Sequence, residues 1–90
     1  MTVTVAQIEF DNVDYDREAD VLYLHVGDPA TATEFDETPE GHHVRFGADG
    51  GIVGLTVVGP RRLLESEGAV RITIPRAARI DASELADVLV

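Results

Sequence analysis

Carboxylates and histidines are the side chains in this sequence whose types and spacing could do chemistry. Four acids stand at alternate positions beside a predicted turn: Asp14, Asp16, Glu18 and Asp20. A calcium-binding loop of the EF-hand type would need a glycine at its sixth position and a carboxylate at its twelfth. Counted from Asp14, those positions hold Ala19 and His25, so the sequence argues against a calcium site of this type.

The two aspartates closest to the turn have a simpler interpretation. Asp16 and Asp20 flank a three-residue segment between two predicted strands. Aspartate side chains in tight turns accept hydrogen bonds from backbone amides nearby in the sequence. We therefore interpret both as turn residues, and an exposed acidic recognition edge is the alternative.

The histidines raise the possibility of a metal site. His42 and His43 are adjacent, and His25 could supply a third ligand. Adjacent residues of a regular strand point to opposite faces of a sheet, so both rings reach one ion only from a loop or a bulge. The spacing is not diagnostic of a zinc site. We expect partly exposed strand histidines, with a metal site as the alternative.

Side chains that act as nucleophiles are scarce. The chain has no cysteine, and its two serines, Ser66 and Ser83, lie outside a nucleophile-elbow context. The segment GADGG, residues 47–51, lacks the lysine and the following helix of a phosphate-binding loop. An enzyme is therefore not favoured, and no cofactor is expected.

Negative charge is concentrated in the first two thirds of the chain. The net charge is −10, and residues 1–59 contain 12 Asp or Glu against two Arg. Such a surface repels nucleic-acid phosphates and attracts a basic protein, so we expect no nucleic-acid partner. No apolar stretch approaches the roughly 20 residues of a membrane span, which predicts a cytoplasmic protein without a membrane partner. Because every basic residue is Arg, a genomic composition bias is the alternative explanation of the charge.

Period-two alternation of apolar and polar residues predicts the elements that must position these side chains. The fold class is α+β, mostly β, in one small domain, residues 1–90. We expect an antiparallel meander of five to seven short strands, with consecutive strands paired and a carboxy-terminal helix packed on one face. The predicted strands are residues 4–10, 12–16, 21–26, 31–37, 42–46, 52–58 and 69–75.

Two helices follow from capping patterns. Pro60 suits a first helical position and Gly68 a helix end, which predicts one or two helical turns between them. Asp81 with Glu84 three residues later is a capping-box pattern that starts the last helix. Its apolar stripe, which would pack on the sheet, is Leu85, Val88 and Leu89.

Two segments resemble a small prokaryotic family of domains of unknown function, number 2283, over about residues 14–59. The first is YDREADVLYLHV, with matching residues Tyr15, Asp16, Ala19, Asp20, Leu22, Tyr23 and Leu24. The second follows Asp49, with matching residues Gly50, Ile52, Val53, Gly54 and Leu55. The sequence departs from the family pattern at Phe46 and Gly47, where an acid is common, and at Thr56, where Glu is common. The resemblance implies no established activity, and by fold-level analogy it suggests an antitoxin-like binder.

These observations predict a non-catalytic protein-interaction module that binds a basic protein partner and forms a homodimer. The candidate interaction or family-motif residues are Tyr15, Asp16, Asp20, Tyr23 and Asp49. A small-ligand or metal-binding protein, or a minor enzyme, is the alternative, and it would use Tyr15, Asp16 and the three histidines. A small subunit that completes a sheet in a larger assembly is the third hypothesis.

Overall fold

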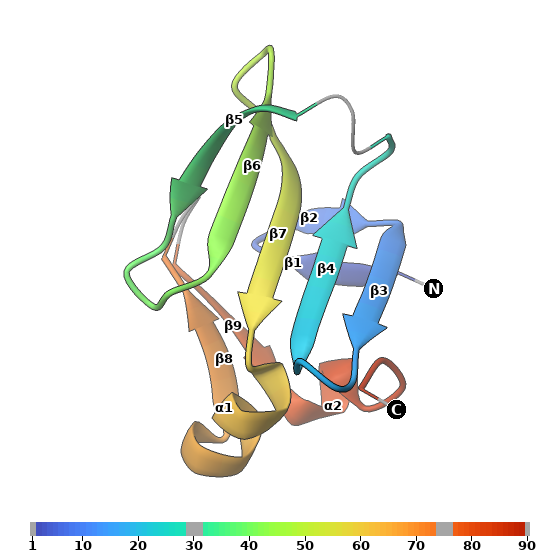
Figure 1. The fold of residues 1–90 in the computed structure, drawn as a ribbon, viewed down its shortest axis with the longest axis vertical. Coiled ribbons are helices and arrows are strands. Elements are labelled where there is room, and N and C mark those ends of the chain that lie inside the picture. The colour runs from blue at the N-terminus through green and yellow to red at the C-terminus, as the bar shows by residue number, and fades with distance from the viewer. Residues whose placement is uncertain (1, 29–31, 74–76, 90) are drawn as a thin grey trace.

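A five-stranded antiparallel sheet dominates the fold (Figure 1), and it confirms the predicted α+β, mostly β class. The structure is a computed structural model that describes residues 2–28, 32–73 and 77–89. The sheet has the strand order β3-β4-β7-β6-β5. Its strands are β3 (Asn12–Asp16), β4 (Val21–His25), β5 (Ala32–Glu37), β6 (His43–Gly47) and β7 (Ile52–Val58).

Consecutive strands were expected to pair, but β2 and β3, and β7 and β8, lie in different sheets, and the five-stranded sheet departs from consecutive pairing once. β4 pairs with β7 and not with β5, so β7 lies at the centre of the sheet and β5 at one edge. The physical reason is in the sequences of the two strands. β7 is almost continuously apolar and buries Leu55 and Val57, whereas β5 is mostly exposed and carries three acids. Charged residues on an edge strand discourage pairing with another chain.

Two short hairpins lie behind this sheet (Figure 1). The prediction of one strand over residues 4–10 was wrong, because Ala6 and Gln7 adopt positive φ angles of 53° and 67° and split the segment into β1 (Val3–Val5) and β2 (Ile8–Phe10). Two consecutive residues of positive φ form the tight turn that suits a hairpin. The second hairpin pairs β8 (Ala69–Ile72) with β9 (Ala78–Asp81), a strand that the sequence analysis missed. The last two residues of the predicted strand 69–75 lie outside the described residues.

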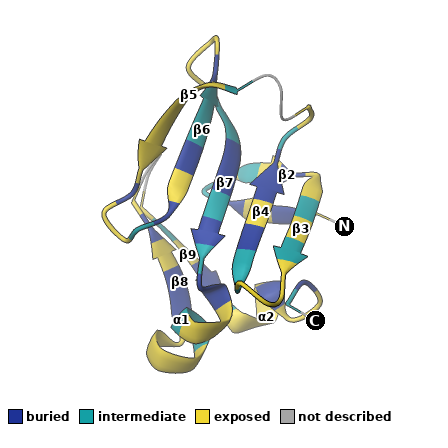
Figure 2. Ribbon diagram, in the orientation of Figure 1, coloured by how far each residue is buried: buried dark blue, intermediate teal, exposed yellow. Residues whose placement is uncertain are grey.

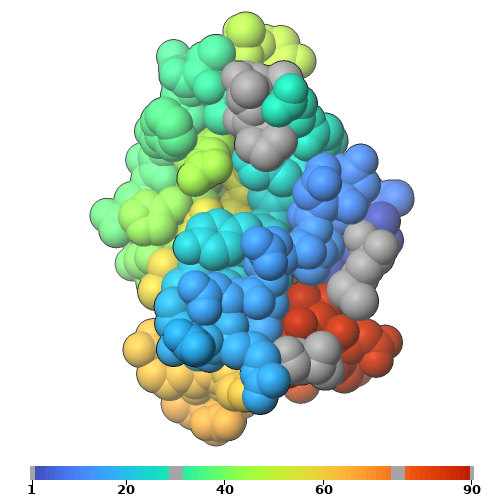
Figure 3. Space-filling view, turned by 45° about the vertical axis from the view of Figure 1, so that its right-hand side comes forward, coloured from blue at the N-terminus to red at the C-terminus, as the bar shows by residue number. Residues whose placement is uncertain are grey.

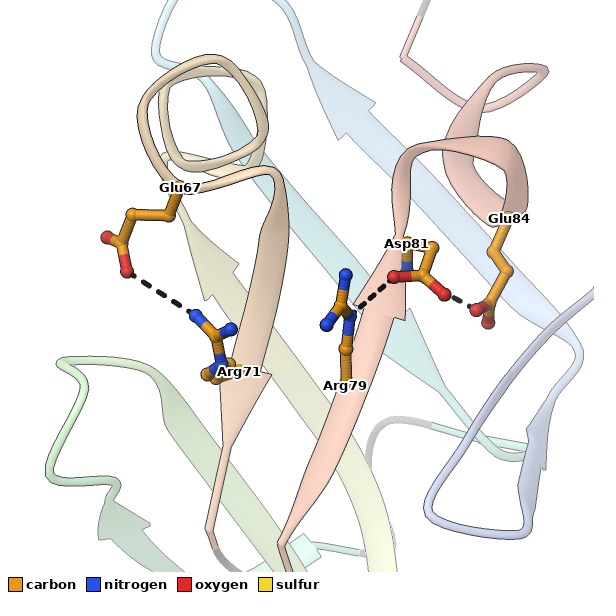
Figure 4. Close-up of polar contacts among 5 residues, drawn as sticks. All are labelled: Glu67, Arg71, Arg79, Asp81 and Glu84. Carbon is orange, nitrogen blue, oxygen red and sulfur yellow. Dashed lines mark hydrogen bonds and ion pairs between the residues drawn. The ribbon is translucent and has the colours of Figure 1, made fainter.

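A helix begins at both predicted places, but the second ends at Leu85, so Val88 and Leu89 of its predicted apolar stripe lie after it. α1 (Pro60–Glu67) begins at the proline and ends at Gly68, as expected. α2 (Ala82–Leu85) is a single turn that begins with the predicted capping box, in which the Asp81 N–H donates to the Glu84 carboxylate at 3.2 Å. Figure 4 shows this contact beside two surface ion pairs, Arg79 with Asp81 and Arg71 with Glu67. No helix among the described residues is long and apolar enough to cross a membrane.

The core lies between the sheet and the two hairpins, where buried residues of both layers meet (Figure 2). The sheet contributes Leu22, Leu24, Val44, Leu55 and Val57. From the other layer come Val3, Val5, Phe10, Val70, Ile72, Ile80 and Leu85. The opposite side of the sheet is covered by no other element within residues 2–28, 32–73 and 77–89, and we call it the open face (Figure 1). By strand register it carries Asn12, Asp14, Asp16, Val21, Tyr23, His25, Phe35, Glu37, His43, Arg45, Gly54, Thr56 and Val58.

Candidate functional site

Asp20, at the start of β4, holds the beginning of α1. Its carboxylate accepts hydrogen bonds from the backbone N–H groups of Arg61 and Arg62, both at 3.2 Å, and from the Tyr15 hydroxyl at 2.7 Å. The Asp20 carbonyl oxygen accepts a further bond from the N–H of Gly59 at 2.7 Å. The first N–H groups of a helix have no partner within the helix, so a carboxylate placed there stabilises it. Asp20 lies in the predicted turn, but its carboxylate does not accept nearby turn amides as expected, because the two amides that it accepts, of Arg61 and Arg62, are about forty residues away.

The hydrogen bonds of this cluster perturb the acidity of both side chains. Burial acts to raise the pKa of Asp20, but the bonds from the Tyr15 hydroxyl and the two amides outweigh it and leave that pKa lowered. Burial raises the pKa of the Tyr15 hydroxyl, and its hydrogen bond to the Asp20 carboxylate adds to the effect. The neutral phenol and the ionised carboxylate therefore favour each other. This pair stabilises the junction between β3, β4 and α1.

Asp16 and Asp49 are turn residues. One carboxylate oxygen of Asp16 accepts the N–H groups of Glu18 and Ala19, each at 3.1 Å, as the sequence predicted. The carboxylate of Asp49 accepts the N–H of Gly51 at 2.9 Å in the hairpin between β6 and β7. Four of the five candidate family-motif or interaction residues are thus engaged in building turns and a helix cap. Tyr23 is the fifth, and it lies on the open face.

The histidines are less exposed than expected. His42 is 1% exposed, and its Nδ1 accepts the backbone N–H of Val58 at 3.0 Å, whereas its Nε2 has no partner in the part of the chain that the structure describes. Burial lowers the pKa of His42, against the opposing charge of Glu40. His25 is 9% exposed, so only His43 fits the expectation of an exposed strand histidine. His42 therefore joins the loop before β6 to the end of β7 through a buried hydrogen bond.

The metal hypothesis gains no geometric support from this arrangement. His25 and His43 lie on β4 and β6, which are separated by β7, and His42 lines a different hollow beside Leu63. Within the described ranges, no three His, Asp or Glu side chains group closely enough to hold a metal ion. Tyr15 bonds Asp20 at the far end of β4. The residues of the alternative hypothesis therefore do not share one cleft.

The open face has a row of bulky side chains interrupted by a glycine. The register places His25 and Arg45 on either side of Gly54, and Phe35 beyond Arg45. The Arg45 guanidinium lies 5.7 Å from the centroid of the Phe35 ring, a cation–π distance. Both ring nitrogens of His25 are buried and have no hydrogen-bond partner among the described residues. Buried polar atoms normally have a partner, so this histidine is an exception in the fold.

Two aromatic side chains of the open face are exposed to solvent. Tyr23 is 41% exposed and Phe35 is 72% exposed, and they are the exposed large apolar residues of the described chain. Acids rim the face on both edges, with Asp14 and Asp16 on β3 and Glu37 on β5. Figure 3 shows the side chains of β3 at the surface of the molecule, uncovered on that edge. The candidate functional site is therefore an aromatic and acidic surface.

Of the residues of this surface, Tyr23 was predicted as a candidate from the sequence, whereas Phe35 and Arg45 were not. A signal for both was present. Phe35 is an aromatic residue within a strand of acids, and Arg45 is one of the two arginines in residues 1–59. Their pairing depends on the register of β5 against β6, which includes a shift between Ala32 and Glu34. That shift could not be read from the sequence.

Residues 12–59 match the family described as "Protein of unknown function (DUF2283)". The match covers more than half of the chain, and it begins with β3 and ends just before α1, so it spans the five-stranded sheet. No curated protein and no solved structure matches the chain.

Proposed function

The chain belongs to the DUF2283 family, and from that premise we propose that it is a non-catalytic protein-interaction module whose open face binds a basic protein. One observation carries the proposal. Tyr23 on β4 and Phe35 on the edge strand β5, the exposed large apolar residues of the described chain, lie on the same uncovered side of the sheet, whose two edge strands carry acids. Protein interfaces are enriched in aromatic residues at their centre and have a polar rim.

The charge of the chain supports a basic partner. The chain has a net charge of −10, and Asp14, Asp16 and Glu37 place negative charge at the edges of the open face. Complementary charges at the rim steer the encounter and raise the association rate, whereas desolvated aromatic anchors slow dissociation. We therefore expect an affinity that falls with ionic strength but keeps an apolar component. A small basic toxin is one partner of this chemistry, in keeping with the antitoxin-like hypothesis.

The bonding of the acids supports a non-catalytic role. Asp16, Asp20 and Asp49 all accept hydrogen bonds from backbone amides that the fold needs. For Asp20, the bonds from Tyr15 and the two amides outweigh burial and leave the pKa of the carboxyl group lowered. These acids therefore contribute to stability rather than to acid–base chemistry.

Three baits test the proposal by capture from cytoplasm at low and high salt. They are the wild type, a Tyr23→Ser/Phe35→Ser double variant, and Arg79→Ser as the control, whose exposed side chain lies on β9. Each captured protein is then purified and titrated onto its bait. We expect a basic protein that binds the wild type and the control, is released by salt, and is lost by the double variant. Equal binding to all three baits would exclude the open face.

The predicted homodimer is read from the molar mass in the same experiment. Two copies bring together surfaces of like charge, which disfavours pairing through the acidic edges. A dimer that becomes a monomer in the Tyr23→Ser/Phe35→Ser variant would assign the open face to a second copy. It would also contradict the proposal of a basic partner at that face.

A further inference from the structure

A hollow of about 310 Å³ lies on the open face, and its lining includes His25 and Arg45, which the protein-binding proposal does not use. It is lined by Asn12, Val13, Asp14, Tyr23, His25 and Arg45, from strands β3, β4 and β6. Small-molecule sites typically have volumes of about 300–1,000 Å³, so this hollow suits a ligand at the small end of the range. All six residues belong to the described part of the chain.

The glycine in β7 keeps space open in this region. Gly54 faces His25 on one side and Arg45 on the other. A Cβ at position 54 would lie 3.2 Å from His25 Nε2 and 3.4 Å from the Cβ and Cδ atoms of Arg45. A side chain there would displace both residues. The sequence of the central strand therefore preserves the approach of His25 and Arg45 over the sheet.

His25 is a polar side chain that the protein itself leaves unsatisfied. It is 9% exposed, lines the hollow, and has no hydrogen-bond partner for either ring nitrogen among the described residues. A neutral imidazole has one N–H donor and one acceptor nitrogen. Leaving buried polar atoms without partners costs free energy, and an occupant that supplies a partner recovers it. His25 is the observation that points to a ligand.

Opposite charges line the same hollow. Arg45 stacks over Phe35 and forms no ion pair within the described residues, so its N–H groups are available to a carboxylate. Asp14 supplies a carboxylate from β3. The amide nitrogen of Asn12 donates to Asp11 and to the Gly27 carbonyl, which leaves the oxygen of that amide as an acceptor. Donors and acceptors therefore come from different strands around one space.

We propose that the hollow binds a small zwitterion of the amino-acid class with an apolar side chain. Its carboxylate pairs with Arg45 and accepts the N–H of His25, and its ammonium group pairs with Asp14. The apolar side chain packs against the ring of Tyr23. A zwitterion has no net charge, so the −10 charge of the protein does not repel it as it would a simple anion. The proposal needs no protein partner and does not rest on the proposed function.

The test is an NMR titration of the wild-type protein with three matched probes. They are L-phenylalanine, phenylpropionate, which lacks the ammonium group, and phenethylamine, which lacks the carboxylate. The ring nitrogen resonances of His25 report occupancy directly. We expect L-phenylalanine to move them and to bind at least about tenfold more tightly than either truncated probe. Equal affinity for the three probes, or no movement of the His25 resonances, would overturn the proposal.

Variants identify the two charged contacts. Arg45→Gln should abolish the advantage of L-phenylalanine over phenethylamine, and Asp14→Asn its advantage over phenylpropionate. Arg71→Gln is the control, because Arg71 is exposed, pairs with Glu67 and lies outside the hollow. Circular dichroism and an unchanged unfolding midpoint establish that each variant is folded. Because there are two independent variants, the test still works if one of them does not fold. If both variants bound L-phenylalanine like the control, the site would be excluded.

Discussion

The two ends of β4 differ in whether their polar side chains have hydrogen-bond partners. Just before the strand, the Asp20 carboxylate accepts bonds from a tyrosine hydroxyl and two helix amides. At the end of the strand, His25 has two buried ring nitrogens and no partner among the described residues. Both residues lie in the part of the chain that matches the family. A polar side chain whose hydrogen bonds are all made within the protein stabilises the fold. A buried polar side chain without such bonds is a candidate for binding another molecule.

Of the changes considered, removal of the Asp20 carboxylate should reduce the stability of the fold most. Asp20→Ala deletes the cap of α1 and the acceptor of the Tyr15 hydroxyl, and we expect a loss of about 3 kcal/mol in the free energy of unfolding. Asp20→Asn is the matched control, because asparagine tolerates the positive φ of 55° and should cost about 1 kcal/mol. Urea unfolding measures both. An unchanged free energy of unfolding in Asp20→Ala would show that the cluster does not hold α1.

His42 sharpens the comparison, because it is a buried histidine whose Nδ1 has a partner. His42→Leu leaves the Val58 N–H unpaired, so we expect a loss of about 1–3 kcal/mol. Burial lowers the pKa of His42 in the folded protein, and the unfolded chain therefore binds a proton first as pH falls. Stability is fully present above about pH 6.5 and decreases as pH falls toward the folded-state pKa. Unfolding followed from neutral to acidic pH should show this slope in the wild type and a smaller slope in the variant.

His25→Leu should act in the opposite direction. The ring nitrogens have no partner to lose, so an apolar side chain of similar size relieves unsatisfied polar atoms and should stabilise the fold by about 1 kcal/mol. The same variant should lose the response to L-phenylalanine. Destabilisation comparable to that of His42→Leu would mean that His25 is satisfied in solution, and the contrast between the two ends of β4 would fail.

The aromatic residues of the open face should have the smallest effect on stability. Tyr23 and Phe35 are 41% and 72% exposed, so the double serine variant should change the free energy of unfolding by less than about 0.5 kcal/mol per site. Differential scanning calorimetry measures this change. A large loss would place the two rings in the packing of the fold and weaken their assignment to an interface.

Much of the sheet could be predicted from the sequence because β3, β4 and β7 have strong period-two or continuous apolar patterns. Their order could not, since the pairing of β4 with β7 depends on which strand is apolar enough for the centre. The role of Asp20 was also out of reach, because its acceptor atoms meet amides that become neighbours only in the folded chain. The hydrogen bonds that Asp16 and Asp49 accept in their turns were easier to predict, because the backbone N–H groups are only a few residues away in the sequence.

Retention of the basic protein on matched baits tests the central claim most directly. The baits are the wild type, Asp20→Asn and Tyr23→Ser/Phe35→Ser, each shown to be folded before capture. If the open face is for recognition and the Asp20 cluster for the fold, Asp20→Asn retains the partner despite lower stability, and the double variant loses it despite unchanged stability. Loss of the partner by Asp20→Asn, with retention by the double variant, would contradict this account.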